Sequence, residues 1–524
     1  MTSKRTIILS LCIFIICVFY YTYYYNYGIS LTDEGYFINT TVRIMNGQLP
    51  YLDFRYYPPA LNYLLAFIFE IFKIDLLYER LLWVFILSIC VLMILKLSKI
   101  IMEFPFWIFP AILLLLIPGP WHKSIIPLLY LSAALMGFGY IKNKTNQIKW
   151  SFYCGVQTSI SLYFRYDISG FLIVTFFCLI TVNNLLLFPL RNRAFKNWLK
   201  EIIFYIIGLA IFMVPALIYA IYAQIQIEFL SDLVRRVSQE HKTMGFPFPK
   251  LDLSAITSNP SGFYFSALFY VPPIVLFSIL FVLILRYYRN KTLKNEDMLV
   301  FLLWLLGLFS YNQTMVRTDY GHLLQSVQIP YILSSYLFWL CFRAVGRAVT
   351  WPKYLAKVSI VTILLFVCGT YIYLNVARGE FYGGTIGNIK NKTTRLLLPN
   401  ARVFLEPSDA REIEDVVAFV NEKTAPDDPI LVLPYEPMYY VLTGRCNPTQ
   451  YDGIFPSTLS GTGMEKAYLR KIKNAHIKLI IYNDMKFTNE DKSRFSVYDK
   501  KIYNFIKLNY RLVKIIGNDQ IYLK

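Results

Sequence analysis

Long apolar segments recur through the first 377 residues of this chain. A helix that crosses a bilayer needs about 20 mostly apolar residues, and about eleven segments meet that criterion. They cover residues 6–26, 79–101, 104–120, 124–141, 150–166, 169–189, 201–223, 263–286, 298–315, 323–343 and 355–377. Hydrophobic residues make up 56% of the chain and charged residues only 16%. Soluble proteins have about 45–50% and 25%, so the sequence predicts a polytopic α-helical membrane protein.

The formal net charge of +19 is explained by where the basic residues lie. If the N-terminus is cytoplasmic, the cytoplasmic loops are rich in Lys and Arg and hold few acids, whereas the opposite loops are nearly balanced. This asymmetry follows the positive-inside rule. We therefore expect a cytoplasmic N-terminus, an extracytoplasmic C-terminus and no nucleic-acid partner.

Two parts of the chain depart from the series of spans. The first outside loop, 27–78, contains an apolar stretch at 58–74 that polar residues interrupt, and we expect an interfacial helix there. Residues 227–242 could form a second one.

The tail is polar and alternates amphipathic segments (411–424, 464–476) with short apolar runs (430–433, 478–482, 511–516, 520–523). It therefore predicts a small extracytoplasmic α/β domain at 378–524, after a membrane module at 1–377.

Clusters of polar residues gather at the predicted outside ends of the spans. The candidates are Asp33 and Glu34 after the first span, Asp53, Arg55 and Tyr57 before the interfacial helix, Lys123, the pair Arg165 and Asp167, and the group Arg317, Asp319 and His322. Each has a structural alternative, as a helix cap, a surface pair or an ion pair that locks a helix end. Ionisable groups at membrane depth are costly unless they are paired or functional, and their shared side favours a functional site.

These features resemble the GT-C superfamily of membrane glycosyltransferases, particularly the bacterial relatives of protein O-mannosyltransferases and of the lipid A aminoarabinose transferases. The resemblance rests on L-T-D-E-G-Y-F at 31–37, N-G-Q-L-P-Y-L-D-F at 46–54, Y-P-P-A-L-N-Y-L at 57–64, R-T-D-Y-G-H-L-L-Q at 317–325, and D-P-I-L-V-L-P-Y-E-P-M-Y-Y-V-L-T-G-R at 428–445. It implies a GT-C fold in the bacterial inner membrane.

The resemblance also implies a function: a sugar moves from a polyprenyl-phosphate donor to a hydroxyl of a glycan, lipid or protein acceptor. Asp33 would be the base, with Glu34 as its neighbour. Arg suits the donor phosphate because its planar fork binds phosphate in a bidentate manner. Inversion at the anomeric carbon is expected. The candidate roles are phosphate binding by Arg165, Arg317, His322 and Lys123, and substrate positioning by Asp53, Arg55, Tyr57, Asp167 and Asp319.

The resemblance leaves a metal cofactor open. Some relatives carry a glutamate-lysine step before the proline of the first loop, whereas here Arg55-Tyr56-Tyr57 precedes Pro58. No cofactor is therefore certain, and a divalent metal remains possible.

Three other functions fit the same spans. A transporter or flippase for a lipid-linked sugar should show internal repeats, and none is visible. A polymerase or ligase of another fold would not need the Asp33-Glu34 pair, and a scaffold would bind a partner through the tail.

Overall fold

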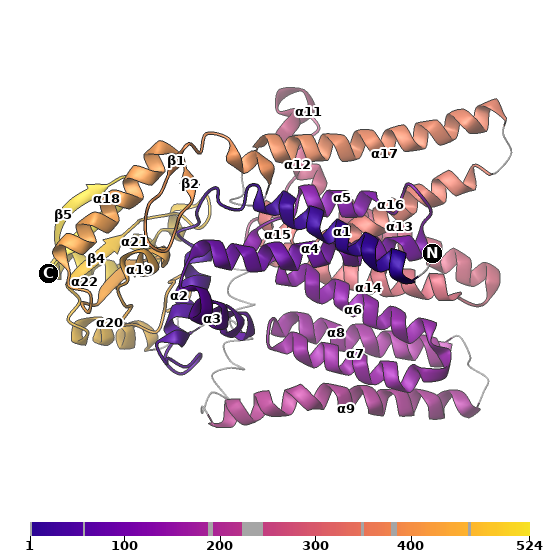
Figure 1. Ribbon diagram of the computed structural model, residues 1–524, viewed down its shortest axis with the longest axis horizontal. Helices are drawn as coiled ribbons and strands as arrows, with labels where there is room; N and C mark the ends of the chain where they lie inside the picture. Colours follow the sequence, from indigo (N-terminus) through magenta and orange to yellow (C-terminus); the bar gives the residue numbers. More distant parts are fainter. Residues whose placement is uncertain are drawn as a thin grey trace. The chain divides into compact units, whose positions relative to one another are not determined.

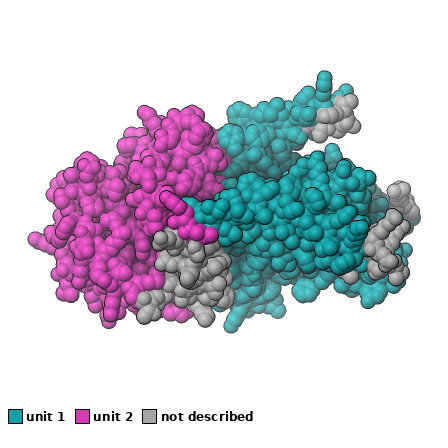
Figure 2. All heavy atoms as spheres, turned by 90° about the horizontal axis from the view of Figure 1, so that it is seen from below, with its two compact units in different colours: residues 1–23, 83–219, 247–387 teal, residues 24–82, 220–246, 388–524 magenta. Residues whose placement is uncertain are grey.

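The computed structural model describes residues 3–55, 58–186, 192–222, 245–346, 350–378, 385–459 and 463–524. The chain forms two compact units, coloured separately in Figure 2. Unit 1 comprises Met1–Tyr23, Trp83–Tyr219 and Pro247–Gly387, and unit 2 comprises Tyr24–Leu82, Ala220–Phe246 and Asn388–Lys524. The first outside loop therefore packs in the same unit as the tail.

Unit 1 is built from helices (Figure 1). They are α1 (Ser3–Thr22), α4 (Leu76–Ile101, in this unit from Trp83), α5 (Phe109–Leu116), α6 (Ile125–Lys142), α7 (Gln147–Leu162), α8 (Tyr166–Thr181), α9 (Asn192–Tyr222), α11 (Ala255–Ser258), α12 (Pro260–Leu268), α13 (Val271–Asn290), α14 (Asn295–Val316), α15 (Tyr320–Leu324), α16 (Gln328–Ala344) and α17 (Trp351–Arg378). A short η1 (Trp121–Lys123) precedes α6, and a π-helical turn, η3 (Val182–Leu186), extends α8.

Seven helices among the described residues are long and apolar enough to cross a membrane. They are Leu76–Ile101, Trp121–Lys142, Tyr166–Leu185, Phe195–Tyr222, Val271–Asn290, Asn295–Val316 and Trp351–Ala377. The other four predicted segments contain shorter helices: the apolar Ile7–Thr22 within α1, and α5, α7 and α16. The prediction of a polytopic helical membrane protein is confirmed.

The predicted span at 104–120 contains the shortest of these helices. α5 has 8 residues, about 12 Å at 1.5 Å per residue, and a hydrocarbon core is about 30 Å thick. Pro105 and Pro110 precede or open the helix, and Pro118 and Pro120 follow it. Proline lacks the N–H that a helix interior needs and restricts the residue before it, so the apolar run is divided.

Several helices of unit 1 carry large apolar side chains on their outer faces. Phe277 on α13 is 75% exposed, Phe366 on α17 is 72% exposed and Leu217 on α9 is 59% exposed. Apolar surface of this extent marks contact with another apolar phase, which for such helices is lipid. A buried pair lies inside this unit, where the Tyr140 hydroxyl donates to Glu201 Oε2 at 2.6 Å.

Unit 2 combines two helices of the first outside loop with an α/β tail (Figure 1). The helices are α2 (Asp33–Met45), α3 (Ala60–Phe72), α18 (Pro407–Lys423), α19 (Met438–Thr443), α20 (Met464–Asn474), α21 (Phe495–Tyr498) and α22 (Lys500–Asn509). The strands are β1 (Thr394–Arg395), β2 (Phe404–Leu405), β3 (Ile430–Leu433), β4 (Leu479–Tyr482), β5 (Arg511–Ile516) and β6 (Asp519–Leu523).

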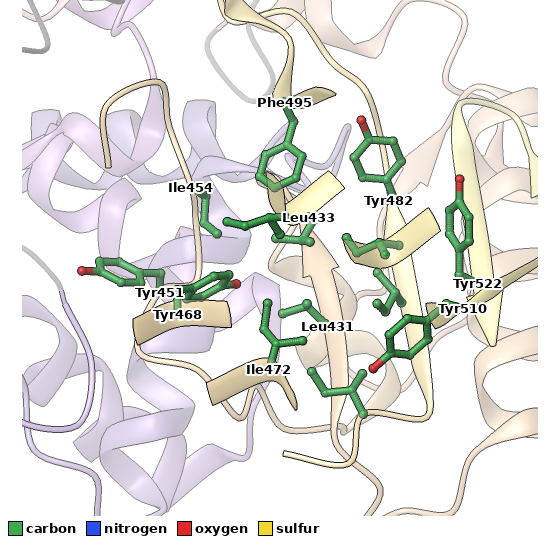
Figure 3. Close-up of a cluster of buried hydrophobic side chains, with 14 of the residues drawn as sticks. Leu431, Leu433, Tyr451, Ile454, Tyr468, Ile472, Tyr482, Phe495, Tyr510 and Tyr522 are labelled. Atoms are coloured by element: carbon green, nitrogen blue, oxygen red, sulfur yellow. The ribbon is translucent and has the colours of Figure 1, made fainter. Parts of the chain in front are cut away.

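The main sheet of the tail has the strand order β3-β4-β6-β5. β3 and β4 pair in parallel, and β6 is antiparallel to both of its neighbours. β3 and β4 are buried at every residue, which explains their continuous apolar sequences. Figure 3 shows side chains from both strands, such as Leu431, Leu433 and Tyr482, in one cluster with Ile472 of α20. The predicted α/β tail is confirmed.

The predicted interfacial segment at 58–74 forms α3. Leu61, Leu65 and Phe69 are buried, whereas Phe67 is 64% and Ile71 57% exposed. The helix therefore has one apolar face against unit 2 and another facing outward, as a helix in a membrane interface would have. Its location at the membrane surface remains a prediction. The second predicted interfacial segment, 227–242, lies outside the described residues.

Candidate functional site

Asp33 stands at the first position of α2, where a tight turn brings the chain into the helix. Its backbone N–H donates to Ser30 Oγ at 3.0 Å. The side chain is half-buried, and its Oδ1 accepts a hydrogen bond of 2.7 Å from the Tyr435 hydroxyl. A carboxylate in the first turn also interacts favourably with the positive end of the helix dipole. The turn therefore holds Asp33 in a defined place.

Glu34 is fully buried and paired with Arg80. Arg80 Nε donates to Oε1 and Nη2 donates to Oε2, each at 2.8 Å. The Ser30 N–H donates to Oε2 at 2.9 Å. Both carboxylate oxygens of Glu34 thus accept hydrogen bonds. These bonds hold the turn that contains Asp33 against Arg80.

Arg80 extends this anchor to the chain before the turn. Its guanidinium also donates to the carbonyl oxygens of Tyr25 at 2.7 Å and Gly28 at 2.8 Å. One buried arginine thus joins the start of α4, the segment 25–28 and the first turn of α2. Sequence reasoning missed Arg80 because it lies within an apolar segment.

Gly35 allows α2 to approach the tail at backbone distance. A Cβ atom at this position would lie 2.3 Å from the Met438 backbone nitrogen, closer than real Cβ contacts. The Met438 N–H donates to the Leu31 carbonyl at 3.1 Å. The three residues Asp33-Glu34-Gly35 therefore have three different tasks: a side chain beside Tyr435, an anchor and a close packing contact.

A second arginine, also missed from sequence, ties α2 to the tail. Arg43 is buried, and its Nη1 donates to Asp452 Oδ1 at 2.8 Å. Its Nη2 donates to the Thr449 carbonyl at 2.9 Å, and its Nε donates to Gln48 Oε1 at 2.6 Å. The sequence does not reveal the contact between Arg43 and Asp452, because about 400 residues separate the two.

Asp53 and Arg55, two further candidates of the first loop, are both described by the structure. Asp53 Oδ2 accepts from the Leu49 N–H at 2.7 Å, which closes an exposed turn. The backbone of Arg55 is fixed, since its N–H donates to the Gln450 carbonyl at 2.9 Å and its carbonyl accepts from the Tyr36 hydroxyl at 3.1 Å. Tyr57 lies outside the described residues.

In unit 1, Arg165 and Asp167 form a two-pronged ion pair at the start of α8. Arg165 Nε lies 2.9 Å from Oδ1, and Nη2 lies 2.7 Å from Oδ2. Gln313 of α14 donates to the same Oδ2 at 2.5 Å. The pair therefore fastens the start of α8 to the end of α14.

Four candidates of unit 1 meet in a second cluster. Arg317 Nε lies 2.9 Å from Asp319 Oδ2, and His322 Nδ1 lies 2.8 Å from Asp319 Oδ1. Lys123 Nζ lies 3.2 Å from His322 Nε2. Lys123, Arg317, Asp319 and His322 are thus gathered although about 200 residues separate the first from the last. Arg317 directly follows the end of α14, the helix whose Gln313 contacts Asp167.

The charges and the burial of the second cluster determine the protonation state of His322. Burial and the charge of Lys123 lower the pKa of His322 to about 4. The neutral ring then donates from Nδ1 to Asp319 and accepts from the Lys123 ammonium at Nε2. Burial opposes ionisation of Asp319, but the His322 hydrogen bond and the charges of Arg317 and Lys123 outweigh it, so the pKa of Asp319 lies below its usual value. The cluster combines two cations with one carboxylate.

This cluster predicts a loss of stability in mild acid. Because the pKa of His322 falls from 6.5 to about 4 on folding, the folded state binds fewer protons than the unfolded state between these values. Stability is therefore greatest above pH 6.5 and declines as the pH falls toward 4. The apparent Tm of the full chain in detergent should fall between pH 7.5 and 4.5, and less in His322→Asn. His476→Asn is the matched control, because His476 is an exposed histidine of the tail. If the Tm fell equally with pH in His322→Asn and in His476→Asn, the prediction would be wrong.

Comparison with solved structures identifies the fold. ArnT from Cupriavidus metallidurans bound to undecaprenyl phosphate is 12% identical, with a TM-score of 0.54, over 99% of this chain and 98% of that chain. The same protein in the apo state is 11% identical, with a TM-score of 0.51, over 100% and 98%. The chain has a GT-C fold. The expectation from the sequence resemblance is thus confirmed for the fold.

One further solved structure has a lower TM-score. The Archaeoglobus fulgidus oligosaccharyltransferase in complex with Zn and sulfate is 11% identical, with a TM-score of 0.47, over 90% of this chain and 68% of that chain. No protein-family model and no curated protein sequence matches this chain.

A divalent cation in a protein is held by several carboxylate, imidazole or thiolate side chains that meet at one point. Among the described residues, no group of three or more His, Cys, Asp or Glu side chains could hold a metal ion. Asp53, the acid nearest the Pro58-Pro59 step in the described loop, has one oxygen in its own turn. These residues do not fit a metal site, and no catalytic step is assigned to one.

Proposed function

We propose that this protein is a membrane glycosyltransferase that moves a sugar from a polyprenyl-phosphate donor to an acceptor hydroxyl. The observation that carries the proposal is the combination of the GT-C fold with Asp33, a carboxylate held at the first position of α2. The ArnT structure of the same fold contains undecaprenyl phosphate, which supports a lipid-phosphate donor. A donor that already carries an activated phosphate needs no nucleotide-binding domain.

Asp33 is proposed as the general base. It accepts the proton of the acceptor hydroxyl while the oxygen attacks the anomeric carbon. The bond from that carbon to the phosphate oxygen breaks, and its electron pair leaves with the polyprenyl phosphate. Attack from the side opposite the phosphate inverts the anomeric centre. A positioned base contributes roughly 10²–10⁴-fold.

Arg317 and Lys123 are proposed to stabilise the leaving phosphate. Arg is suited to this task because its planar guanidinium stays charged and can contact two phosphate oxygens. Asp319 holds Arg317 through the contact of 2.9 Å, and His322 holds Lys123 through the contact of 3.2 Å. Arg165 is proposed as a further phosphate ligand; like Arg317, it is paired with a nearby aspartate, Asp167. Glu34 is proposed as a support for the Asp33 turn.

The charge pattern of the loops supports a membrane orientation for this reaction. With a cytoplasmic N-terminus, Asp33 and the tail lie on the extracytoplasmic side. We propose the bacterial inner membrane as the location, with a glycan, lipid or protein as the acceptor.

The test is transfer by the purified full-length protein in liposomes that contain radiolabelled polyprenyl-phosphate sugars. Transfer is followed as release of polyprenyl phosphate and label on an acceptor, with nucleotide sugars as the comparison donors. Transfer from lipid donors alone supports the proposal. Movement of the intact lipid-linked sugar across the bilayer without bond cleavage would overturn it in favour of a transporter.

A further inference from the structure

A tyrosine of the tail forms a hydrogen bond with Asp33, the proposed catalytic base. β3 ends at Leu433, and the segment Pro434–Pro437 leads into α19. From this segment, the Tyr435 hydroxyl donates to Asp33 Oδ1 at 2.7 Å. Both residues belong to unit 2, although 402 positions separate them in the sequence.

The backbone around Tyr435 is held on both sides. The Asn483 N–H donates to the Leu433 carbonyl at 2.8 Å, which continues the pairing of β3 with β4. The Ile454 N–H donates to the Pro434 carbonyl at 2.9 Å. Tyr435 is therefore attached to the edge of a buried sheet rather than to an independent loop.

The ring of Tyr435 is fixed by other aromatic rings. It is only 7% exposed. Its centroid lies 4.6 Å from that of Phe455, 5.7 Å from that of Tyr36 and 6.4 Å from that of Phe487. Tyr36 itself lies on α2, three residues after Asp33. The hydroxyl oxygen is thereby placed with little freedom relative to the first turn of α2.

The register between the two segments is set by the main chain. The Met438 N–H donates to the Leu31 carbonyl at 3.1 Å, and Gly35 packs directly on the Met438 backbone. Arg43 adds the bonds to Asp452 and Thr449. Rigid support of this kind is what a positioned catalytic group needs.

We propose that Tyr435 is a positioning residue for Asp33. The C-terminal domain then supplies a side chain that orients the catalytic base. The proposal rests on the proposed function of Asp33. The Tyr435 O–H donates to one carboxylate oxygen and fixes the rotation of the group, which directs its other lone pairs toward the acceptor. A hydrogen bond to the charged form also favours ionisation of the acid, and a base must be ionised before it can accept a proton.

The experiment compares Tyr435→Phe with Tyr482→Phe in the full-length protein. Tyr482 is a matched control because it is buried in the same domain and its hydroxyl donates to a different aspartate, Asp484 Oδ1, at 2.6 Å. In Tyr435→Phe we expect kcat to fall about tenfold with little change in KM. The acidic limb of the pH–rate profile should move upward by about one pH unit, which is a tenfold change in a protonation constant. Tyr482→Phe should leave the profile in place.

A second measurement does not depend on turnover. Infrared spectra of protein labelled with ¹³C-carboxyl aspartate, recorded as a difference against Asp33→Asn, report the ionisation of this one carboxyl group as the pH is varied. The midpoint should rise in Tyr435→Phe and stay constant in Tyr482→Phe. An unchanged midpoint in Tyr435→Phe would overturn the inference. A shifted midpoint in a protein without transferase activity would support the contact and overturn the proposed function alone.

Discussion

Replacing Glu34 by Gln is expected to destabilise unit 2 by about 3–5 kcal/mol, the usual effect of removing one partner of a buried ion pair. Both side chains of the Glu34–Arg80 pair are 0% exposed. Glutamine keeps the size of the side chain, but it is uncharged and presents only one acceptor oxygen. Arg80 would then stay buried without its two contacts to the Glu34 carboxylate.

The change would act first on the turn before α2. Arg80 also binds the carbonyls of Tyr25 and Gly28, and the Ser30 N–H binds Glu34. Loss of the pair therefore loosens the segment 25–34 from α4. Native-state hydrogen exchange is the suitable measurement, because it reports opening at this segment within the full chain. Amides of 25–45 should exchange roughly 200- to 5,000-fold faster in Glu34→Gln, the factor that corresponds to a loss of about 3–5 kcal/mol.

Glu465→Gln is the matched control for this prediction. Glu465 pairs with Lys501, whose side chain is 72% exposed, at 2.7 Å in the same unit. Exposed pairs contribute about 0–1 kcal/mol, so exchange in 25–45 should stay near the wild-type rate. Equal and small effects of the two substitutions would show that the buried pair is not the anchor of the turn.

The contrast between Asp33 and Glu34 also marks the limit of sequence reasoning. Two adjacent acids after an apolar segment look alike in a sequence. The structure separates them through partners distant in the chain: Arg80 for Glu34 and Tyr435 for Asp33. Long-range pairing of this kind leaves no local periodicity. The sequence predicts the acidic turn, and only the three-dimensional contacts distinguish its members.

Local patterns were sufficient for most helices and for the tail sheet. Continuous apolar runs predicted β3 and β4, because a strand buried on both faces has no alternation. The segment 104–120 was less well predicted, since hydropathy ignores the prolines that shorten α5 to Phe109–Leu116. The packing of residues 24–82 with residues 388–524 depends on contacts such as Arg43 with Asp452, which no local pattern in the sequence shows.

The cationic cluster was predictable in part. The spacing in R-T-D-Y-G-H places Asp319 before α15, where it accepts from the His322 N–H at 2.8 Å as a helix cap. That short-range contact follows from the sequence. The approach of Lys123 to His322 does not, because it requires η1 and α15 to meet. The sequence offers Lys123 as a candidate through its place at a predicted outside helix end, and only the structure shows its contact with His322.

Asp33→Asn is expected to lower kcat for sugar transfer by about 10²–10⁴-fold, the contribution of a positioned general base. Asparagine has the same shape, and its carbonyl oxygen can still accept the hydrogen bond from Tyr435. The turn, the Glu34 anchor and the contact of Gly35 with Met438 involve other atoms. The substitution therefore removes the proton acceptor and leaves its support in place, so KM for the lipid donor should change little.

The measurement is the initial rate of polyprenyl phosphate release over a range of donor concentrations and pH, beside Asp409→Asn as the control. Asp409 is an exposed carboxylate in the first turn of α18, so it also neutralises an acid at a helix start in unit 2. Its kcat should match wild type. If Asp33→Asn kept more than about a tenth of the wild-type kcat, general-base catalysis by Asp33 would be excluded. A raised KM with an unchanged kcat would instead mean that Asp33 binds the substrate equally in the ground state and in the transition state. A residual rate without the acidic limb would agree with the loss of the base, because the titrating group itself would be gone.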